Sequence, residues 1–137
     1  MNKVLVFKCG EYNFSFDISY IKEIKGWIKP TLLPSTEKHI EGIINIRGAI
    51  IPVVDLYNII TGNNNLNKKA LIVVYFMEKM ISFSVSSVSD IIEYSKINQT
   101  PEIFADNTNL INGIIESDNR SIFSINLSMI MEKVIDK

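Results

Sequence analysis

Residues 41–56 carry the densest structural signal in the sequence and read Glu41-Gly42-Ile43-Ile44-Asn45-Ile46-Arg47-Gly48-Ala49-Ile50-Ile51-Pro52-Val53-Val54-Asp55-Leu56. Two apolar segments flank Arg47-Gly48, which predicts two strands joined by a tight turn, because glycine tolerates the positive φ that such turns need. Side chains alternate along a strand, so Ile44 and Ile46 share one face while Asn45 and Arg47 point the other way. The pattern alone leaves open whether the arginine at this corner is a solvated charge or a contact for a partner.

Apolar residues outside this hairpin also recur with a period of two, which is typical of strands. Phe14, Phe16 and Ile18 alternate with polar residues, and Phe83 and Val85 do the same. Four runs are apolar on both faces, as expected for strands of a small closed barrel: 4–7, 43–46, 50–54 and 71–76. The sequence therefore predicts an all-β fold.

The chain also repeats itself. A shift of 67 positions places Leu5-Val6-Phe7 on Ile72-Val73-Val74, and a shift of 71 places Gly42-Ile43-Ile44 on Gly113-Ile114-Ile115. We interpret this as a duplicated unit of roughly 60 residues, the size of a small SH3-like barrel. The prediction is two packed five-stranded SH3-like barrels, 1–66 and 67–127, lying side by side because units this small bury little surface alone.

A short helix should follow each barrel. Asp55 is positioned to cap the first, over 56–60, and Gly62 to end it. Ser128 is positioned to cap a C-terminal helix over 128–137. The apolar residues of that helix fall on one face, as in a helix packed on a core: Leu127, Ile130, Met131, Val134 and Ile135.

Composition argues against several classes of function. The net charge is −1 and Lys and Arg are scattered, whereas a nucleic-acid binder needs a basic face. Cys9 is the only cysteine, which excludes an internal disulfide, and its apolar neighbours predict a buried strand thiol. His39 is the only histidine, and no phosphate-binding glycine motif is present. We expect no catalysis, no cofactor and no metal site.

No apolar run is long enough for a membrane-spanning helix, which needs about 20 residues. The longest, 70–77, is much shorter, and the N-terminal apolar run is too brief for a signal sequence. The sequence therefore predicts a cytoplasmic protein without direct membrane insertion.

Residues 41–56 resemble the signature of the CheW family of chemotaxis coupling proteins. That signature has a glycine, a hydrophobic pair, Asn, an aliphatic residue, Arg-Gly, aliphatics around a proline, and Asp-Leu. Further similarities extend over nearly the whole chain: Val4-Leu5-Val6-Phe7 to the family's opening strand, Ile21-Lys22-Glu23-Ile24 to its V-x-E-I segment, Leu32-Leu33-Pro34 to its proline turn, and 85–91 to its second half. The resemblance implies two intertwined five-stranded barrels.

The resemblance also implies an adaptor function. Family members are scaffolds that join the cytoplasmic tips of chemoreceptors, in membrane receptor arrays, to the regulatory domain of the histidine kinase CheA. Carried over to this sequence, the receptor-binding residues would be Ile21, Glu23, Gly42 and Arg47, with Glu23 and Arg47 paired across strands. The kinase-binding candidates are Ile28 and Leu32 on the first barrel.

Two other readings remain open from the sequence. A CheW-like adaptor could serve a kinase pathway other than motility. A small-barrel nucleic-acid-binding module would need exposed aromatic residues beside a basic stripe. Trp27, Tyr12 and Tyr20 supply aromatic rings, but positive charge is not concentrated around them.

Overall fold

Strands make up most of the chain, as the period-two pattern predicted. The computed structural model describes residues 2–34, 37–99 and 109–135. The elements in these ranges are β1 (Asn2–Cys9), β2 (Tyr12–Asp17), the 3-10 helix η1 (Ile18–Tyr20), β3 (Ile21–Gly26), β4 (Ile40–Ile46), β5 (Ala49–Asp55), α1 (Leu56–Thr61), β6 (Ala70–Phe76), β7 (Lys79–Val85), β8 (Ser87–Tyr94), β9 (Ile111–Ser117), β10 (Arg120–Ile125) and α2 (Leu127–Ile135).

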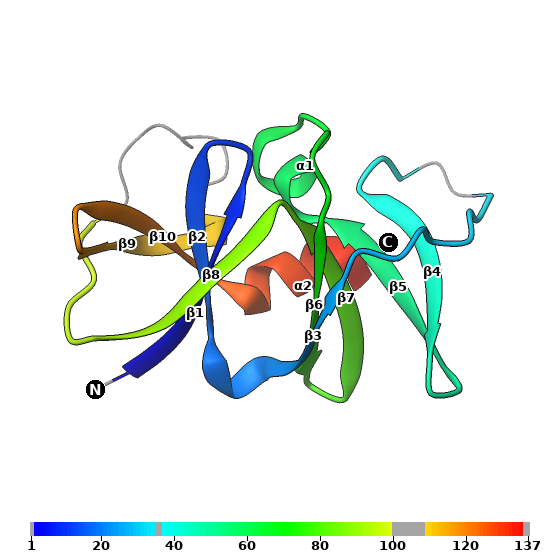
Figure 1. The fold of residues 1–137 in the computed structure, drawn as a ribbon, viewed down its shortest axis with the longest axis horizontal. Helices are drawn as coiled ribbons and strands as arrows, with labels where there is room; N and C mark the ends of the chain where they lie inside the picture. The colour runs from blue at the N-terminus through cyan, green and yellow to red at the C-terminus, as the bar shows by residue number, and fades with distance from the viewer. Residues whose placement is uncertain (1, 35–36, 100–108, 136–137) are drawn as a thin grey trace.

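The strands form two curled five-stranded sheets that lie side by side (Figure 1). One has the order β8-β1-β2-β10-β9; because it holds the first two and the last three strands, we call it the terminal barrel. The other, the central barrel, has the order β3-β6-β7-β5-β4. The two orders match strand for strand when β1 is paired with β6, β2 with β7, β3 with β8, β4 with β9 and β5 with β10. The predicted all-β fold with two SH3-like units is confirmed, and its symmetry is that of a duplication.

The barrels do not follow the predicted division at residue 66. The hairpin β1–β2 pairs with β8 and β10, and β3 pairs with β6, so each barrel combines strands of both sequence repeats. The cause is the connection after β2, where η1 carries the chain out of one sheet and into the other. Residue 66 therefore marks the end of a repeat and not the end of a barrel, and the barrels are intertwined.

Three apolar clusters explain why so many strands are apolar on both faces. Each barrel has a small interior of its own: Ile44, Ile46, Ile51, Val53, Leu71 and Val73 in the central barrel, and Val4, Val6, Ile115 and Ile122 in the terminal one. The opposite faces of the same strands meet in a larger shared core, which includes Phe7, Phe14 and Phe83. The second buried face thus packs against the other barrel, and burial of these aromatic residues holds the two barrels together.

The helices complete the shared core. Asp55 caps α1 by accepting a hydrogen bond from the Asn58 N–H at 3.2 Å, and Gly62 ends it with a φ of +82°, both as predicted. Helix α2 lies between the two sheets (Figure 1) and buries Leu127, Ile130 and Met131. It starts one residue before the predicted Ser128.

The cap of α2 is Asn126, whose Oδ1 accepts the Met129 N–H at 3.3 Å. Ser128 is exposed on the first turn, so its assignment as the cap was wrong. Asn126 is the repeat equivalent of Asp55, so both helices are capped from the same place in the duplicated unit.

Cys9 is fully buried in β1, as predicted for a strand thiol. Burial, and then the nearby charge of Asp55, raises the pKa of the Cys9 thiol to about 12, so the thiol stays protonated and unreactive. Among the described residues, neither helix is long and apolar enough to cross a membrane. Within the same ranges, histidine, cysteine and carboxylate side chains form no cluster suited to a metal ion.

Candidate functional site

The turn between β4 and β5 places Arg47 at the outer end of the central barrel. Arg47 and Gly48 have φ values of +51° and +89°, which is the backbone of a type I′ hairpin turn. The Asn45 Oδ1 accepts the Gly48 N–H at 2.9 Å and fixes the turn. A left-handed conformation costs a non-glycine residue about 1–2 kcal/mol, so the fold holds Arg47 in place against this strain.

Arg47 and Glu23 form the ion pair that the resemblance implied. Nη1 of Arg47 donates to Oε1 of Glu23 at 2.7 Å, and Nη2 donates to Oε2 at 3.1 Å. Lys25 adds a longer contact to Oε2 of Glu23, at 3.4 Å. The hydrogen bonds from Arg47 hold the pKa of Glu23 below its usual value. One edge of the guanidinium is thus occupied, yet 75% of the Arg47 side chain remains exposed and faces solvent.

This pair joins the two edges of the central sheet. Glu23 lies on β3 and Arg47 directly follows β4, and these are the outermost strands of the sheet. At the middle of β4, Thr31 and Ile43 exchange two backbone hydrogen bonds of 2.8 and 2.9 Å, which brings the segment after β3 onto β4. The partly open barrel is therefore fastened at two points along β4, by an ion pair just after its end and by a backbone bridge at its middle.

The terminal barrel has a matching pair. Arg120 binds Asp90 through two hydrogen bonds of 2.9 and 3.1 Å, and the pKa of Asp90 is lowered by them. Asp90 is the repeat equivalent of Glu23, so an acid–arginine pair belongs to both barrels. The two arginines differ in exposure, because only 25% of the Arg120 side chain is exposed. Arg47 combines the structural contact with a surface that Arg120 does not offer.

Gly42 and Ile21, the other two receptor-binding candidates, contribute to the packing of the barrel. Gly42 is buried with a φ of +148°, and a Cβ there would collide with the carbonyl oxygen of Thr31. Gly42 therefore allows the close approach that the Thr31–Ile43 bridge needs, and it offers no side chain to a partner. Ile21 is half-buried at the start of β3 and packs against the shared core.

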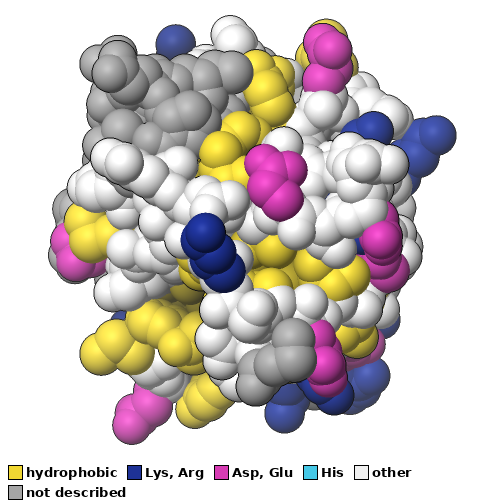
Figure 2. Space-filling view, turned by 90° about the vertical axis from the view of Figure 1, so that its left-hand side faces the viewer, with side chains coloured by type: hydrophobic (Ala, Val, Ile, Leu, Met, Phe, Trp, Pro, Cys, Tyr) yellow, Lys and Arg dark blue, Asp and Glu magenta, His cyan; other side chains and the backbone are white. Residues whose placement is uncertain are grey.

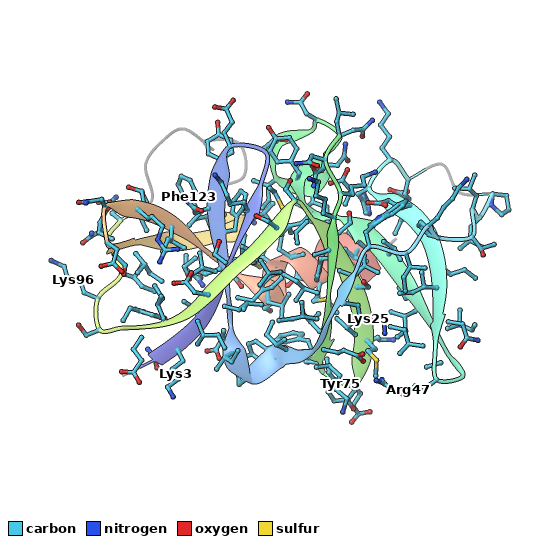
Figure 3. The ribbon with its side chains drawn as sticks, viewed as in Figure 1. Lys3, Lys25, Arg47, Tyr75, Lys96 and Phe123 are labelled. Atoms are coloured by element: carbon cyan, nitrogen blue, oxygen red, sulfur yellow. The ribbon has the colours of Figure 1, made fainter. Side chains whose placement is uncertain are left out.

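Two exposed apolar side chains at the same end of the barrel were not predicted as site residues from the sequence. Tyr75 is 49% exposed and Met77 is 76% exposed. Met77 and Glu78 form the β6–β7 turn with φ values of +49° and +65°. Because β5 runs parallel to β7, both hairpin turns lie at one end, and Figure 3 shows Lys25, Arg47 and Tyr75 together there. We call this end, formed by Glu23, Arg47, Tyr75 and Met77, the barrel mouth.

The kinase-binding candidates lie elsewhere. Ile28 and Leu32 are 42% and 77% exposed on the segment between β3 and β4. Leu32 borders a groove of about 360 Å³ at the opposite end of β4 from Arg47. We call this groove the β3–β4 groove; its lining residues are Trp27, Lys29, Pro30, Leu32, Ile40, Glu41 and Lys68. Glu23 and Arg47 thus lie at one end of the central barrel and Leu32 lies toward the other, while Gly42 lies against Thr31 and Pro30 on the Leu32 side.

Positive charge in these places is largely paired with acid. Lys25 lies beside Glu23, and Lys68 lies 3.6 Å from the carboxylate of Glu41. On the end of the molecule formed by the terminal barrel, charged side chains of both signs are scattered (Figure 2). This distribution does not favour the nucleic-acid alternative, which needs a basic surface beside its aromatic residues.

Comparison with known proteins gives one consistent result. The family model for the CheW-like domain matches residues 3–134. The probable chemotaxis protein CheW of Rhizobium etli is 29% identical over 136 residues, which cover 96% of this chain and 88% of that protein. The chemotaxis protein CheW of Bacillus subtilis is 26% identical over 136 residues, covering 96% and 87%. The crystal structure of the scaffolding protein TtCheW from Thermoanaerobacter tengcongensis superposes with a TM-score of 0.82 at 30% identity, covering 92% of this chain and 84% of that one.

Proposed function

The chain belongs to the CheW-like domain family, and on this basis we propose that it is a chemotaxis adaptor. It couples the cytoplasmic tips of chemoreceptors to the regulatory domain of the histidine kinase CheA by binding both. The protein acts in the cytoplasm, is recruited to receptor arrays at the membrane, and transforms no substrate.

The observation that carries this proposal is the anchored but exposed guanidinium of Arg47. Glu23 fixes its orientation through two hydrogen bonds, and three quarters of the side chain face solvent. A pre-oriented arginine can bind a carboxylate or a carbonyl group of a partner with little further loss of side-chain entropy. Tyr75 and Met77 beside it supply apolar contact area, as an amphipathic receptor helix requires.

Two separate surfaces suit a scaffold. The barrel mouth is proposed for the receptor, and Ile28 and Leu32 are proposed for the kinase, at opposite ends of the same rigid barrel. Signalling then needs only different affinities of this chain for the two activity states of the kinase, and coupling free energies of about 1–3 kcal/mol are typical of such linkage.

The test is binding of a purified receptor-tip fragment to Arg47→Glu and to Arg120→Glu. Both substitutions break an acid–arginine pair in one barrel, and because Arg120 is the less exposed of the two, its replacement carries at least as large a structural cost. We expect Arg47→Glu to remain folded and to lose receptor binding at least tenfold, about 1.4 kcal/mol, and Arg120→Glu to bind as the wild type does. Equal receptor binding by Arg47→Glu and wild type would show that Arg47 is no receptor contact.

A further inference from the structure

The turn between β6 and β7 differs from its copy in the terminal barrel. By the shift of 67 positions, Met77-Glu78 corresponds to Gly10-Glu11, the turn between β1 and β2. The first residue of each turn has a positive φ, of +49° for Met77 and +60° for Gly10. Glycine adopts such a conformation without strain, whereas a residue with a side chain does not. The fold therefore accepts glycine at this position, and the methionine of the central barrel needs another reason.

The surroundings of the two turns differ as well. Tyr57 of α1 covers Gly10 so closely that a Cβ there would lie 2.9 Å from the tyrosine ring. The Met77 side chain is 76% exposed, so it contributes little to the core. The backbone strain at Met77 thus supports a side chain that faces solvent, at the same end of the barrel as Tyr75 and Arg47. Strain that persists on a surface is typical of functional sites.

Met77 also differs from the other described methionines in its access to solvent. Met131 is only 4% exposed, and Met80 and Met129 are half-buried and pack against the core. The sulfur of Cys9 is fully buried, and burial raises the pKa of this thiol to about 12, so the thiol stays protonated at neutral pH. Within the described ranges, a small oxidant in solution therefore reaches the thioether of Met77 before any other sulfur.

We propose that Met77 is a reversible oxidation site and that its oxidation by a peroxide weakens receptor binding at the barrel mouth. The peroxide transfers one oxygen atom to the thioether sulfur: an S–O bond forms, the O–O bond breaks, and water leaves when the oxidant is hydrogen peroxide. The sulfur loses two electrons, which the peroxide gains. A methionine sulfoxide reductase reverses the step, as two thiols become a disulfide and the oxygen leaves as water. The inference rests on the proposed function, because its effect is on the receptor contact.

The change in polarity explains the loss of binding. The thioether of methionine is apolar, whereas the sulfoxide carries a strong dipole and a hydrated oxygen. Burial of the sulfoxide against the apolar face of a receptor helix removes this water without a matching hydrogen bond. Because the Met77 side chain lies outside the three apolar clusters, the fold itself should tolerate the added oxygen.

Peptide mapping tests the site without any partner. The folded protein is treated briefly with dilute hydrogen peroxide, and mass spectrometry follows the sulfoxide at each methionine. Met77 should be oxidised about tenfold faster than Met131 or more, and the two rates should converge in urea, where both side chains are exposed. Equal rates for Met77 and Met131 in the folded protein would overturn the assignment of the site.

Receptor binding tests the effect of the oxidation. Treated wild type, freed of peroxide before the receptor-tip fragment is added, should bind about fivefold more weakly or less, with an unchanged thermal midpoint. Methionine sulfoxide reductase should restore the binding. Met77→Leu keeps an apolar side chain without sulfur and should bind as untreated wild type does, before and after treatment. Met80→Leu is the matched control, and its binding should fall on treatment as that of the wild type does. Met77→Gln, which is polar, should bind weakly without peroxide.

Three results would overturn the inference. Oxidised wild type binds the receptor tip as tightly as untreated wild type, Met77→Leu loses as much binding on treatment as the wild type does, or Met77→Gln binds normally. Failure of untreated wild type to bind the receptor tip would instead overturn the proposed function, and with it the effect on binding. The peptide map would then still decide whether Met77 is the selective oxidation site.

Discussion

Arg47 joins the two edges of the central barrel through Glu23 and also exposes its guanidinium to solvent. The pH dependence of stability measures the first of these two roles. The hydrogen bonds from Arg47 lower the pKa of Glu23 in the folded protein. A carboxyl group whose pKa falls on folding stabilises the protein above its unfolded pKa, about 4.3 for Glu. This stabilisation is lost as the pH falls through the lower, folded value.

The wild type should therefore be more stable than Arg47→Ala at pH 7, and the difference should shrink as the pH approaches 3. Urea unfolding at several pH values measures it. Salt at about 1 M should shrink the difference as well, because the pair is exposed and the screening length is then only about 3 Å. Lys22→Ala removes an exposed charge without an ion pair in the described structure, and its effect should not change with pH. A pH-independent difference for Arg47→Ala would mean that the pair contributes nothing to stability.

The hairpin β4–β5 and its connections show how one buried glycine can shape a binding surface. Gly42 lets the segment after β3 approach β4, and this segment carries Trp27 and Leu32, which line the β3–β4 groove. Gly42→Ala should therefore destabilise the protein by about 2 kcal/mol or more, through strain and a backbone collision. It should also weaken kinase binding, although Gly42 itself contacts no partner.

Gly48→Ala is the matched control for that prediction. Gly48 also has a positive φ, of +89°, but a Cβ there would meet no atom within 4 Å. The control should show strain alone, about 1 kcal/mol, and normal kinase binding. Denaturant unfolding and calorimetric titration with the CheA regulatory domain measure both effects. Equal loss of kinase binding in the two variants would contradict a role for the Thr31–Ile43 bridge in shaping the groove.

Local sequence patterns predicted the turns and helix caps that depend on residues close together in the chain. The turn at Arg47-Gly48 and the cap at Asp55 depend on residue types with strong conformational preferences, and both were found as predicted. The turn at Met77-Glu78 was missed because neither residue is a usual turn former and Met77 continues the apolar run of residues 70–77. Asn126 was passed over for Ser128 because both residue types cap helices, and the capping bond depends on where the helix starts.

Strand partners depend on contacts far apart in the sequence, so the repeat predicted two barrels but not their composition. The two copies of each strand have the same pattern, and either copy could complete a given sheet equally well by that pattern alone. The structure places β1 and β2 with β8 and β10. A buried polar network lies at one crossing: Ser86, between β7 and β8, donates its N–H to the Lys8 carbonyl at 2.8 Å and contacts Asn65 and Gly10 through its hydroxyl. Because β6, β7 and β5 lie between β3 and β4 in the central sheet, no strand pairing brings Glu23 next to Arg47, and only the family resemblance could suggest that pair.

Intertwined barrels with a shared core should unfold together. Phe14 lies in the terminal barrel and is fully buried in the shared core, while Trp27, the only tryptophan, follows β3 of the central barrel. Phe14→Ala should cost about 3–5 kcal/mol. It should lower the urea midpoint equally by Trp27 fluorescence and by circular dichroism, because loss of the shared core exposes both barrels at once. Leu66→Ala, on an exposed side chain, should leave both midpoints unchanged. If the fluorescence midpoint stayed at the wild-type value while the circular dichroism midpoint fell, the central barrel would fold on its own. The binding surfaces at its two ends would then not require the terminal barrel.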